Sequence, residues 1–423
     1  MYGLSQLDNG LKVVTVGLKD RHSVGLGIWV KAGARFEAPK ISGVSHFLEH
    51  MLFKGTKNRS TQKIKMDVEG LGGVLNAFTG EEAICYIVKI LRDYAEKAFD
   101  VLADMINSAT LDQKELVRER TVILEEIKMY LDLPSHHVHE LMSELLWPDQ
   151  ALGRPIAGSH ETVSNLNAPD LRRYMDYYYH PRNLLVSFCG DIPHGKVLAL
   201  AEHAFGKRKA KLDSKFSKAD SKQLAPRFHF LNKKTEQMHF VIGFHALSKS
   251  HPARYTLSIL NVILGANMSS RLFEEVREKR GLAYEIRSGL SYFEDTGAIA
   301  ISAGLEPSKA QMAVGVIMKE LKKFKEKLVS DGELKRAKDY FMGQFWMGLE
   351  DTLDHMLWVG DRMLYHKNLP DREEIFRNIK KVTAADVKAL AQKLFKTNSL
   401  NLALIGSYAG QFEDQIKNEC ACD

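Results

Sequence analysis

A repeated order of amphipathic helix, short polar break and apolar strand runs through both halves of the chain. Residues 168–191 show it once and residues 384–407 show it again, and each strand stops at a glycine. Asp170 and Asp386 are the predicted N-caps of the two helices. Because the apolar positions of the two segments keep a constant offset of 216 residues, we interpret the segments as two copies of one structural unit.

The same offset relates a strand near the start of the chain to a strand in the middle. The segment VGLGIWV from Val24 aligns with FVIGFHA from Phe240, so that Gly27 aligns with Gly243. Between the two copies, the lysine-rich segment 206–224 lacks apolar periodicity and is predicted to be a linker.

Length and composition agree with two globular domains. A chain of 423 residues is too long for one hydrophobic core, and its 45% hydrophobic and 26% charged residues are ordinary for a globular protein. We therefore predict two duplicated domains, residues 1–205 and 225–423, joined by the linker 206–224. The net charge of +6 is not gathered into a basic face, so a nucleic-acid partner is not expected.

The chain shows no pattern of an export signal or a membrane segment. Its first residues lack a basic stretch followed by an apolar one, and no run of about 18 apolar residues appears. The cysteines are few and widely spread, which favours a reducing compartment. We therefore expect a cytoplasmic protein without membrane contact, and a frayed C-terminal end that carries Cys420 and Cys422.

The segment SHFLEHMLFKGT, residues 45–56, belongs to a predicted helix with one apolar face and one polar face. His46, Glu49 and His50 share the polar face, and the two imidazoles are one turn apart. That spacing suits two ligands of one tetrahedral zinc ion, and Glu49 can accept a proton from a water on the metal. From the motif alone, two solvated histidines remain an alternative. The predicted buried face of this helix consists of Val44, Phe47, Leu48, Met51 and Leu52.

The duplication bears on this motif. Shifted by 216 residues, the three polar positions become Val262, Gly265 and Ala266, none of which can bind a metal through its side chain. A solvated face would be expected to stay polar in both copies. We therefore predict a metal site in the first domain and none in the second.

A zinc ion needs a third protein ligand, and a predicted helix at 114–131 can supply it. Glu119 and Glu126 share one face of this helix, because seven residues are nearly two turns. Glu126 can complete a His₂Glu site, and Glu119 can hold a ligand histidine through its other ring nitrogen. From the residues alone, Glu125 remains a rival to Glu126, and a solvated acidic face remains an alternative. The predicted apolar stripe of the helix is Leu116, Ile123, Leu124, Ile127 and Leu131.

Other histidines are less specific. The segment SHHVHE at 135–140 is predicted to be a loop with surface histidines, because its histidines lack helical spacing. His239 and His245 lie on one predicted strand without an acid or a cysteine nearby. No nucleophile elbow or phosphate-binding glycine loop appears.

Four motifs follow one another in the order of a known family. They are GVSHFLEHMLFKGT, GGVLNAFTGEEAICY at 72–86, ERTVILEEIKMY at 119–130 and SSRLFEEVREKRGLAYEI at 269–286. HxxEH is the inverted form of the HExxH zinc motif. Over nearly its whole length the chain resembles the pitrilysin and mitochondrial-processing-peptidase family of inverzincin zinc metallopeptidases, and in length it is similar to the short bacterial members.

The resemblance implies a metal site and a base. His46, His50 and Glu126 would bind one zinc ion per chain, and Glu49 would be the general base. Glu119 would be the acid that holds a ligand histidine from behind.

The resemblance also implies contacts to a peptide substrate. Asn76, Ala77 and Phe78 would lie on an edge strand that pairs with the substrate backbone. Arg277 and Tyr284 would reach the substrate carbonyl from the second domain and stabilise the developing oxyanion.

The fold implied by the resemblance is α+β, with a mostly antiparallel sheet covered by helices in each domain. The two domains would form half of a clamshell, and a second copy of the chain would supply the other half. The implied function is a zinc-dependent endopeptidase that cleaves unfolded peptides inside a closed chamber. A non-catalytic scaffold or binding subunit of the same fold is the competing interpretation.

Overall fold

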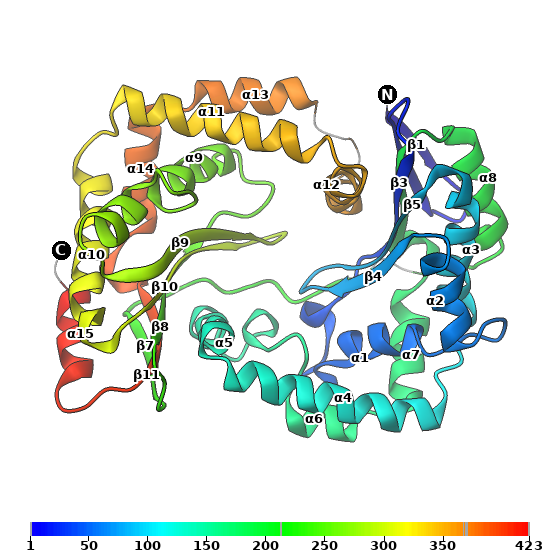
Figure 1. Ribbon diagram of the computed structural model, residues 1–423, viewed down its shortest axis with the longest axis horizontal. Coiled ribbons are helices and arrows are strands. Elements are labelled where there is room, and N and C mark those ends of the chain that lie inside the picture. The colour runs from blue at the N-terminus through cyan, green and yellow to red at the C-terminus, as the bar shows by residue number, and fades with distance from the viewer. Residues whose placement is uncertain (1, 212–213, 367, 369–370, 422–423) are drawn as a thin grey trace. The chain divides into compact units, whose positions relative to one another are not determined.

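The computed structural model describes residues 2–211, 214–366, 368 and 371–421, which divide into two compact units (Figure 1). The first unit comprises residues 1–127, 154–217 and 346–369, and the second comprises residues 128–153, 218–345 and 370–423. Each unit is built on one β-sheet with helices packed against it.

The first unit contains a six-stranded sheet that is antiparallel except where β2 pairs with β6. Its strands are, in spatial order, β1 (Tyr2–Gln6), β2 (Lys12–Gly17), β6 (Leu184–Gly190), β3 (Ser23–Val30), β5 (Ile84–Leu91) and β4 (Val74–Thr79). The strand β4 therefore lies at one edge of the sheet.

The second unit contains a five-stranded sheet with the same pairing pattern. Its strands are, in spatial order, β7 (Arg227–Asn232), β11 (Asn401–Gly406), β8 (Met238–Ala246), β10 (Gly297–Leu305) and β9 (Ala283–Tyr292). The single parallel pair, β7 with β11, matches β2 with β6 in the first sheet. The predicted α+β fold of two duplicated, mostly antiparallel sheets is confirmed.

Helices cover both sheets. Those of the first unit are α1 (Val44–Leu52), α2 (Thr61–Glu69), α3 (Ala95–Ser108), α4 (Gln113–Asp132), α6 (His160–Asn165), α7 (Ala168–Tyr178), α8 (His194–Phe205) and α12 (Thr352–Tyr365). Only the part of α4 up to Ile127 belongs to this unit. Those of the second unit include α5 (Pro134–Leu146), α9 (Arg254–Leu264), the π-helix η6 (Phe273–Glu278), α10 (Ala310–Glu326), α11 (Asp331–Gly348, as far as Phe345), α13 (Arg372–Lys381), α14 (Ala384–Leu394) and α15 (Phe412–Ala421).

Strand alternation gives the first sheet two covered faces. On β3, Leu26 and Ile28 enter the core that also contains the apolar side of α1. Trp29 points to the other face, where it packs in a cluster with residues of α12. A side chain at Gly360 of α12 would collide with the Trp29 ring, so the helix can approach the sheet only because this residue is a glycine.

The two units exchange helices along the chain. α5 lies between β5 and β6 of the first sheet in sequence but packs on β8 and β11 of the second, whereas α12 follows the strands of the second sheet except β11 and packs on β3 and β6 of the first. The units defined by contacts therefore differ from a division of the chain at residues 206–224. Part of that segment also packs, since Phe216 lies edge-on to Phe36 with ring centroids 5.3 Å apart.

The predicted N-caps of the duplicated helices are wrong by three residues. Asn167 and Thr383 are the N-caps of α7 and α14, and Asp170 and Asp386 are the third helical residues. Each aspartate accepts a hydrogen bond from the N-cap backbone, while the N-cap side chain accepts one from the aspartate backbone. The 216-residue offset itself holds for both helices.

Three further expectations are corrected. The predicted loop at 135–140 is part of α5, because Pro134 occupies the first helical turn, where its missing N–H costs nothing. Leu131 is exposed rather than part of the buried stripe of α4. Cys420 is buried on α15 instead of lying in a frayed end, and Cys422 lies outside the described residues.

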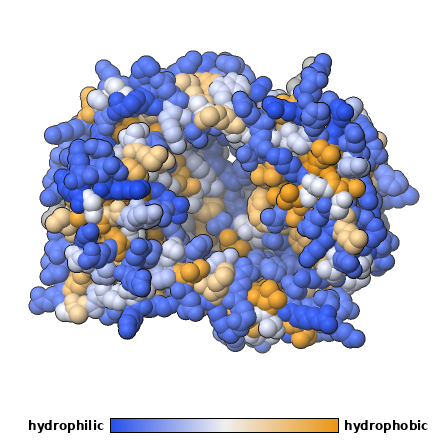
Figure 2. Space-filling view, viewed as in Figure 1, coloured by the Kyte–Doolittle hydropathy of each residue, from blue (hydrophilic) through white to orange (hydrophobic). Residues whose placement is uncertain are grey.

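The surface is mainly polar. On the face shown in Figure 2, hydrophilic side chains cover most of each unit, and hydrophobic side chains form smaller patches between them. In the part of the chain that the structure describes, no helix is both long and apolar enough to cross a membrane.

Candidate metal centre

The helix α1 is fixed by the apolar face that the sequence predicts. The side chains of Val44, Phe47, Leu48, Met51 and Leu52 are fully buried in the core of the first unit. The opposite face, which carries His46, Glu49 and His50, is only partly buried. Burial of one face thus aims the three polar side chains away from the core.

The N-terminus of α1 is held by a buried carboxylate. Gly43 precedes the helix at a φ of +91°, a conformation that favours glycine. The Glu37 carboxylate accepts hydrogen bonds from the backbone N–H of Gly43 at 2.7 Å and of Ser45 at 2.8 Å, and from the Ser45 hydroxyl. Burial raises the pKa of Glu37 to about 7, although these donors and the charge of Arg154 act in the opposite direction.

Two histidines of α1 and one glutamate of α4 converge. The ligand atoms offered by His46, His50 and Glu126 all lie within 4.8 Å of one another, and no other such group occurs among the described residues. The Nε2 atoms of His46 and His50 lie 3.8 Å and 3.7 Å from Oε2 of Glu126.

These separations fit a zinc ion. Ligand atoms about 2.0–2.1 Å from a tetrahedral zinc are about 3.3 Å from one another. The two imidazole–carboxylate distances need only a small contraction to reach that value, and imidazole with carboxylate is a common zinc donor set. Three protein ligands also leave a fourth position for a water molecule.

A second glutamate of α4 orients one ligand. Nδ1 of His50 lies 3.2 Å from Oε2 of Glu119, so that Nε2 of His50 faces Glu126. The other oxygen of Glu119 pairs with Nζ of Lys54 at 2.7 Å. Lys54 lies in the turn that follows the C-cap of α1, and its charge balances the buried carboxylate.

The electrostatics of His46 suit metal binding. Burial lowers the pKa of His46 to about 4, and the neighbouring His50 adds to this effect, while Glu126 opposes it. His46 is therefore a neutral imidazole at neutral pH, with a lone pair available to a metal.

Glu49 lies on the same face of α1 as His46 and His50 but is not one of the three residues of the cluster. Its Oε2 accepts a hydrogen bond of 2.5 Å from the hydroxyl of Thr79, the last residue of β4. Burial raises the pKa of Glu49, and the charge of Glu126 adds to this, whereas Thr79 and His50 act against it.

The edge strand β4 holds the predicted substrate residues. β4 pairs with β5, and its other edge has no strand partner within the described residues. Asn76 and Phe78 are exposed, and Ala77 is half-buried against the core beneath α1. The structure thus places Asn76, Ala77 and Phe78 on an edge strand in the same unit as the cluster of His46, His50 and Glu126.

Arg277 and Tyr284 lie together in the second unit. The Arg277 guanidinium stands 5.5 Å from the centroid of the Tyr284 ring and 4.7 Å from that of Phe273. Tyr284 is 78% exposed at the start of β9, so its hydroxyl is available to a ligand. Arg277 sits on the π-helix η6, a rare backbone form that often marks functional sites.

The structure selects Glu126 over Glu125, since only Glu126 joins the histidines in the cluster. It also adds three residues that the sequence reasoning missed: Glu37, Lys54 and Thr79.

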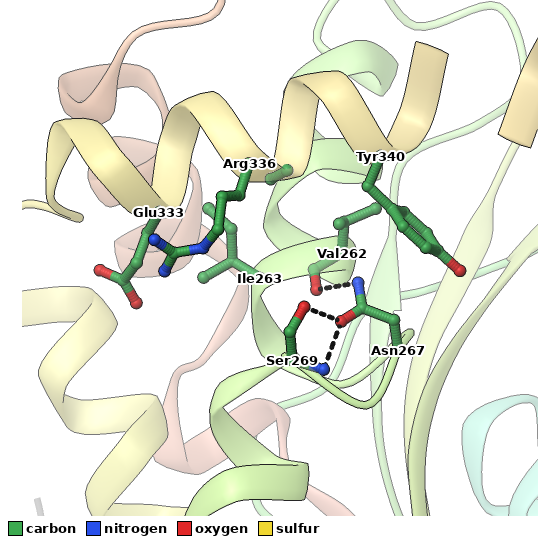
Figure 3. Close-up of a pocket in the computed structure, with 8 residues that line it drawn as sticks. Val262, Ile263, Asn267, Ser269, Glu333, Arg336 and Tyr340 are labelled. Atoms are coloured by element: carbon green, nitrogen blue, oxygen red, sulfur yellow. Dashed lines mark hydrogen bonds between the residues drawn. The ribbon is translucent and has the colours of Figure 1, made fainter. Parts of the chain in front are cut away.

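Two other hollows are poor candidates for a peptide site. The pocket between α9 and α11 is drawn in Figure 3. Its volume of about 30 Å³ is close to the room for one water molecule. Its Asn267 is used internally, because Oδ1 accepts hydrogen bonds from the Ser269 N–H and hydroxyl. A wider hollow of about 660 Å³ beside α2 and α3 is lined in part by Arg59, which is paired with Asp67 and Asp104.

An HxxEH helix, a glutamate from a second helix and a duplicated α+β chain together define the class of inverzincin-type metallopeptidases. Comparisons with known proteins identify the family. The description "Insulinase (Peptidase family M16)" matches residues 12–160, and "Peptidase M16 inactive domain" matches residues 165–341. The chain belongs to peptidase family M16.

Relatives and solved structures agree with this assignment. The chain is 39% identical to the "Uncharacterized zinc protease YmxG" of Bacillus subtilis, over 94% of this chain and 96% of the relative. It is 36% identical to a zinc protease of Streptomyces coelicolor, over 95% and 88%. The fold matches the crystal structure of a protease from Helicobacter pylori with a TM-score of 0.91 at 24% identity, over 96% of this chain and 99% of that one.

Proposed function

We propose that this protein is a zinc-dependent endopeptidase that cleaves unfolded peptides. The observation that supports it most is the convergence of His46, His50 and Glu126 within 4.8 Å, with Glu49 on the same helix face. The names of the relatives as zinc proteases support the choice of metal.

In this proposal one zinc ion per chain is held by Nε2 of His46, Nε2 of His50 and the carboxylate of Glu126. When bound, the zinc supplies a Lewis acid that activates a water molecule for attack on a peptide bond. Glu119 fixes the ring of His50 through Nδ1, which leaves Nε2 free for the metal.

Glu49 is proposed as the general base. It takes the proton of the attacking water at its carboxylate and later delivers that proton to the leaving amine. It can do so because it shares the polar face of α1 with the histidines and is not among the ligand atoms.

The substrate is proposed to bind as an extended strand. The open edge of β4 offers backbone N–H and C=O groups, so a peptide can pair with Asn76, Ala77 and Phe78. Arg277 and Tyr284 are proposed to reach the carbonyl of the bond to be cut and to stabilise its negative charge. Arg277 and Tyr284 are included because the motif at 269–286 that contains them resembles a motif of the family.

A homodimer in the bacterial cytoplasm completes the proposal. Two copies of the chain would enclose a chamber that admits only unfolded peptides. A homodimer is favoured because one chain carries the metal ligands, the base and the Arg277–Tyr284 pair.

A non-catalytic scaffold is the competing function. One observation favours it: the family description that matches residues 165–341 is named an inactive domain, as is a similar structure from Pseudomonas fluorescens with a TM-score of 0.88 and 19% identity. That match does not include α1 or Glu126. The helix α9, which lies in the matched region, contains no histidine, cysteine or acidic residue.

The two functions are separated by incubating the purified protein with a long unstructured peptide and analysing the products by mass spectrometry. The endopeptidase predicts internal cuts that stop after chelation and return when zinc is restored. The same peptide sequence held inside a stably folded protein is the matched control and is expected to stay intact. If the protein is a scaffold, the peptide is expected to stay uncut both with and without zinc.

A further inference from the structure

The proposed base Glu49 is held by the strand next to it. The Thr79 hydroxyl donates a 2.5 Å hydrogen bond to Oε2 of Glu49. Within the described residues, no other hydrogen-bond donor contacts this carboxylate. Oε1 of Glu49 is therefore left for a water molecule or another reacting group.

The direction of Thr79 follows from strand alternation. Along β4, Leu75, Ala77 and Thr79 are half-buried, whereas Asn76 and Phe78 point to the other face and are exposed. Leu75 and Ala77 pack on the core that contains the apolar residues of α1. Thr79 continues this inward row at the end of the strand and so meets the polar face of α1 at Glu49.

We propose that Thr79 is a positioning residue that fixes the carboxylate of Glu49 for proton transfer. This inference rests on the proposed function, because it assigns Thr79 a role in the step that Glu49 would perform. It also makes the edge strand β4 serve two purposes: its backbone edge is open to an extended peptide, and its last side chain holds the base.

The chemistry of the two side chains supports this role. A glutamate has several rotatable bonds and samples many positions unless something holds it. A threonine on a strand has a restricted first side-chain torsion, so its hydroxyl is a pre-set anchor. A base displaced by about 1 Å can lose about 100-fold in rate, so a single anchoring hydrogen bond matters.

The test compares Thr79→Val, which removes the hydroxyl but keeps the shape, with Thr79→Ser, which keeps the hydroxyl. A matched control is Thr15→Val, because Thr15 is a strand residue of the same sheet whose hydroxyl lies 2.9 Å from Nδ1 of His194. The assay measures kcat and KM on an internally quenched unstructured peptide, together with the zinc content of each protein.

Thr79→Val is expected to lower kcat about 10–100-fold with little change in KM, since its side chain faces the base and not the peptide. Zinc content is expected to stay at the wild-type level. Thr79→Ser is expected to retain most of kcat, and Thr15→Val nearly all of it.

Equal activity of Thr79→Val and wild type would overturn the proposal, and so would an equal loss in Thr79→Ser and Thr79→Val. Absence of cleavage by the zinc-loaded wild type is the distinct failure of the proposed function. In that case crystal structures of the zinc-loaded wild type and Thr79→Val decide. The proposal expects the Glu49 carboxylate to move, and an unmoved carboxylate overturns it.

Discussion

The buried carboxylate of Glu37 predicts a pH-dependent stability of the first unit. Glu37→Gln removes the charge but keeps the size of the side chain and an oxygen that can accept from the N–H groups of Gly43 and Ser45. Burial raises the pKa of Glu37 from 4.5 to about 7 in the folded protein. The folded state therefore binds this proton more tightly than the unfolded state does.

The sign and the size of this pH effect follow from the linkage between proton binding and folding. A raised folded pKa contributes stability that is fully present below pH 4.5 and is lost as the pH rises towards about 7. A shift of this size corresponds to about 3 kcal/mol, because one pKa unit is worth about 1.4 kcal/mol. Glu37→Gln has no such proton, so its stability relative to wild type is expected to rise by about 2–3 kcal/mol between about pH 5 and about pH 8.

Urea unfolding of both proteins at these two pH values measures the difference directly. A matched control is Glu115→Gln, since Glu115 lies on α4 and pairs with Arg118 at the surface. The Glu115 side chain is 27% exposed rather than enclosed in the core, so its replacement is expected to change stability with pH much less than Glu37→Gln does. The reasoning fails if the difference between wild type and Glu37→Gln is the same at both pH values.

Three further substitutions test the metal centre, the core of α1 and the second unit. Glu119→Gln is expected to weaken zinc affinity about 10–100-fold, because His50 loses the carboxylate that orients its ring, and competition with a chromophoric chelator measures this. Leu48→Ala is expected to lower the free energy of unfolding by about 2–5 kcal/mol, measured by urea unfolding, because the side chain is fully buried. Arg271→Lys is expected to cost about 1–3 kcal/mol, seen as faster hydrogen exchange in η6, because it breaks the two-pronged pair with Glu333.

Each substitution has a control at a less buried position. Glu115→Gln serves Glu119→Gln, Met66→Ala serves Leu48→Ala, and Arg287→Lys serves Arg271→Lys. Unchanged zinc affinity in Glu119→Gln would contradict the orienting role of that carboxylate. Equal losses in a variant and its control would contradict the structural reason given for the variant.

Helical periodicity predicted the two faces of α1 well, because one strong pattern fixes both of them. The apolar positions of α1 are all buried, and this alone puts His46, Glu49 and His50 on one side. From the residues alone the choice between Glu125 and Glu126 stayed open, and only the family resemblance implied Glu126. In the structure Glu126 is the one that lies with the two histidines, which depends on how α1 and α4 meet.

Duplication was detectable where both copies keep the same length between elements. The offset of 216 residues holds for α7 and α14 but fails for α1 and α9, because α9 begins earlier and ends at Leu264. Gly265 and Ala266 therefore lie beyond this helix. The conclusion that α9 lacks metal ligands survives, since none of its residues is a histidine, a cysteine or an acid.

Contacts between distant segments could not be predicted. The apolar face of α12 shows that it must be buried, but not that Met356 and Val359 cover the first sheet. The same limit applies to Thr79 and Glu49, which meet only because the edge strand ends beside α1. Local pattern fixes what a residue can do, and tertiary packing fixes what it contacts.

The central claim is that Glu49 and the His46–His50–Glu126 cluster form a peptidase centre. The most direct measurement compares wild type with Glu49→Gln, both folded and loaded with zinc, on one long unstructured peptide followed by mass spectrometry. Cleavage by wild type and loss of cleavage in Glu49→Gln at equal zinc content is the predicted result. Equal cleavage by both proteins, or none by zinc-loaded wild type across several peptides, would contradict it.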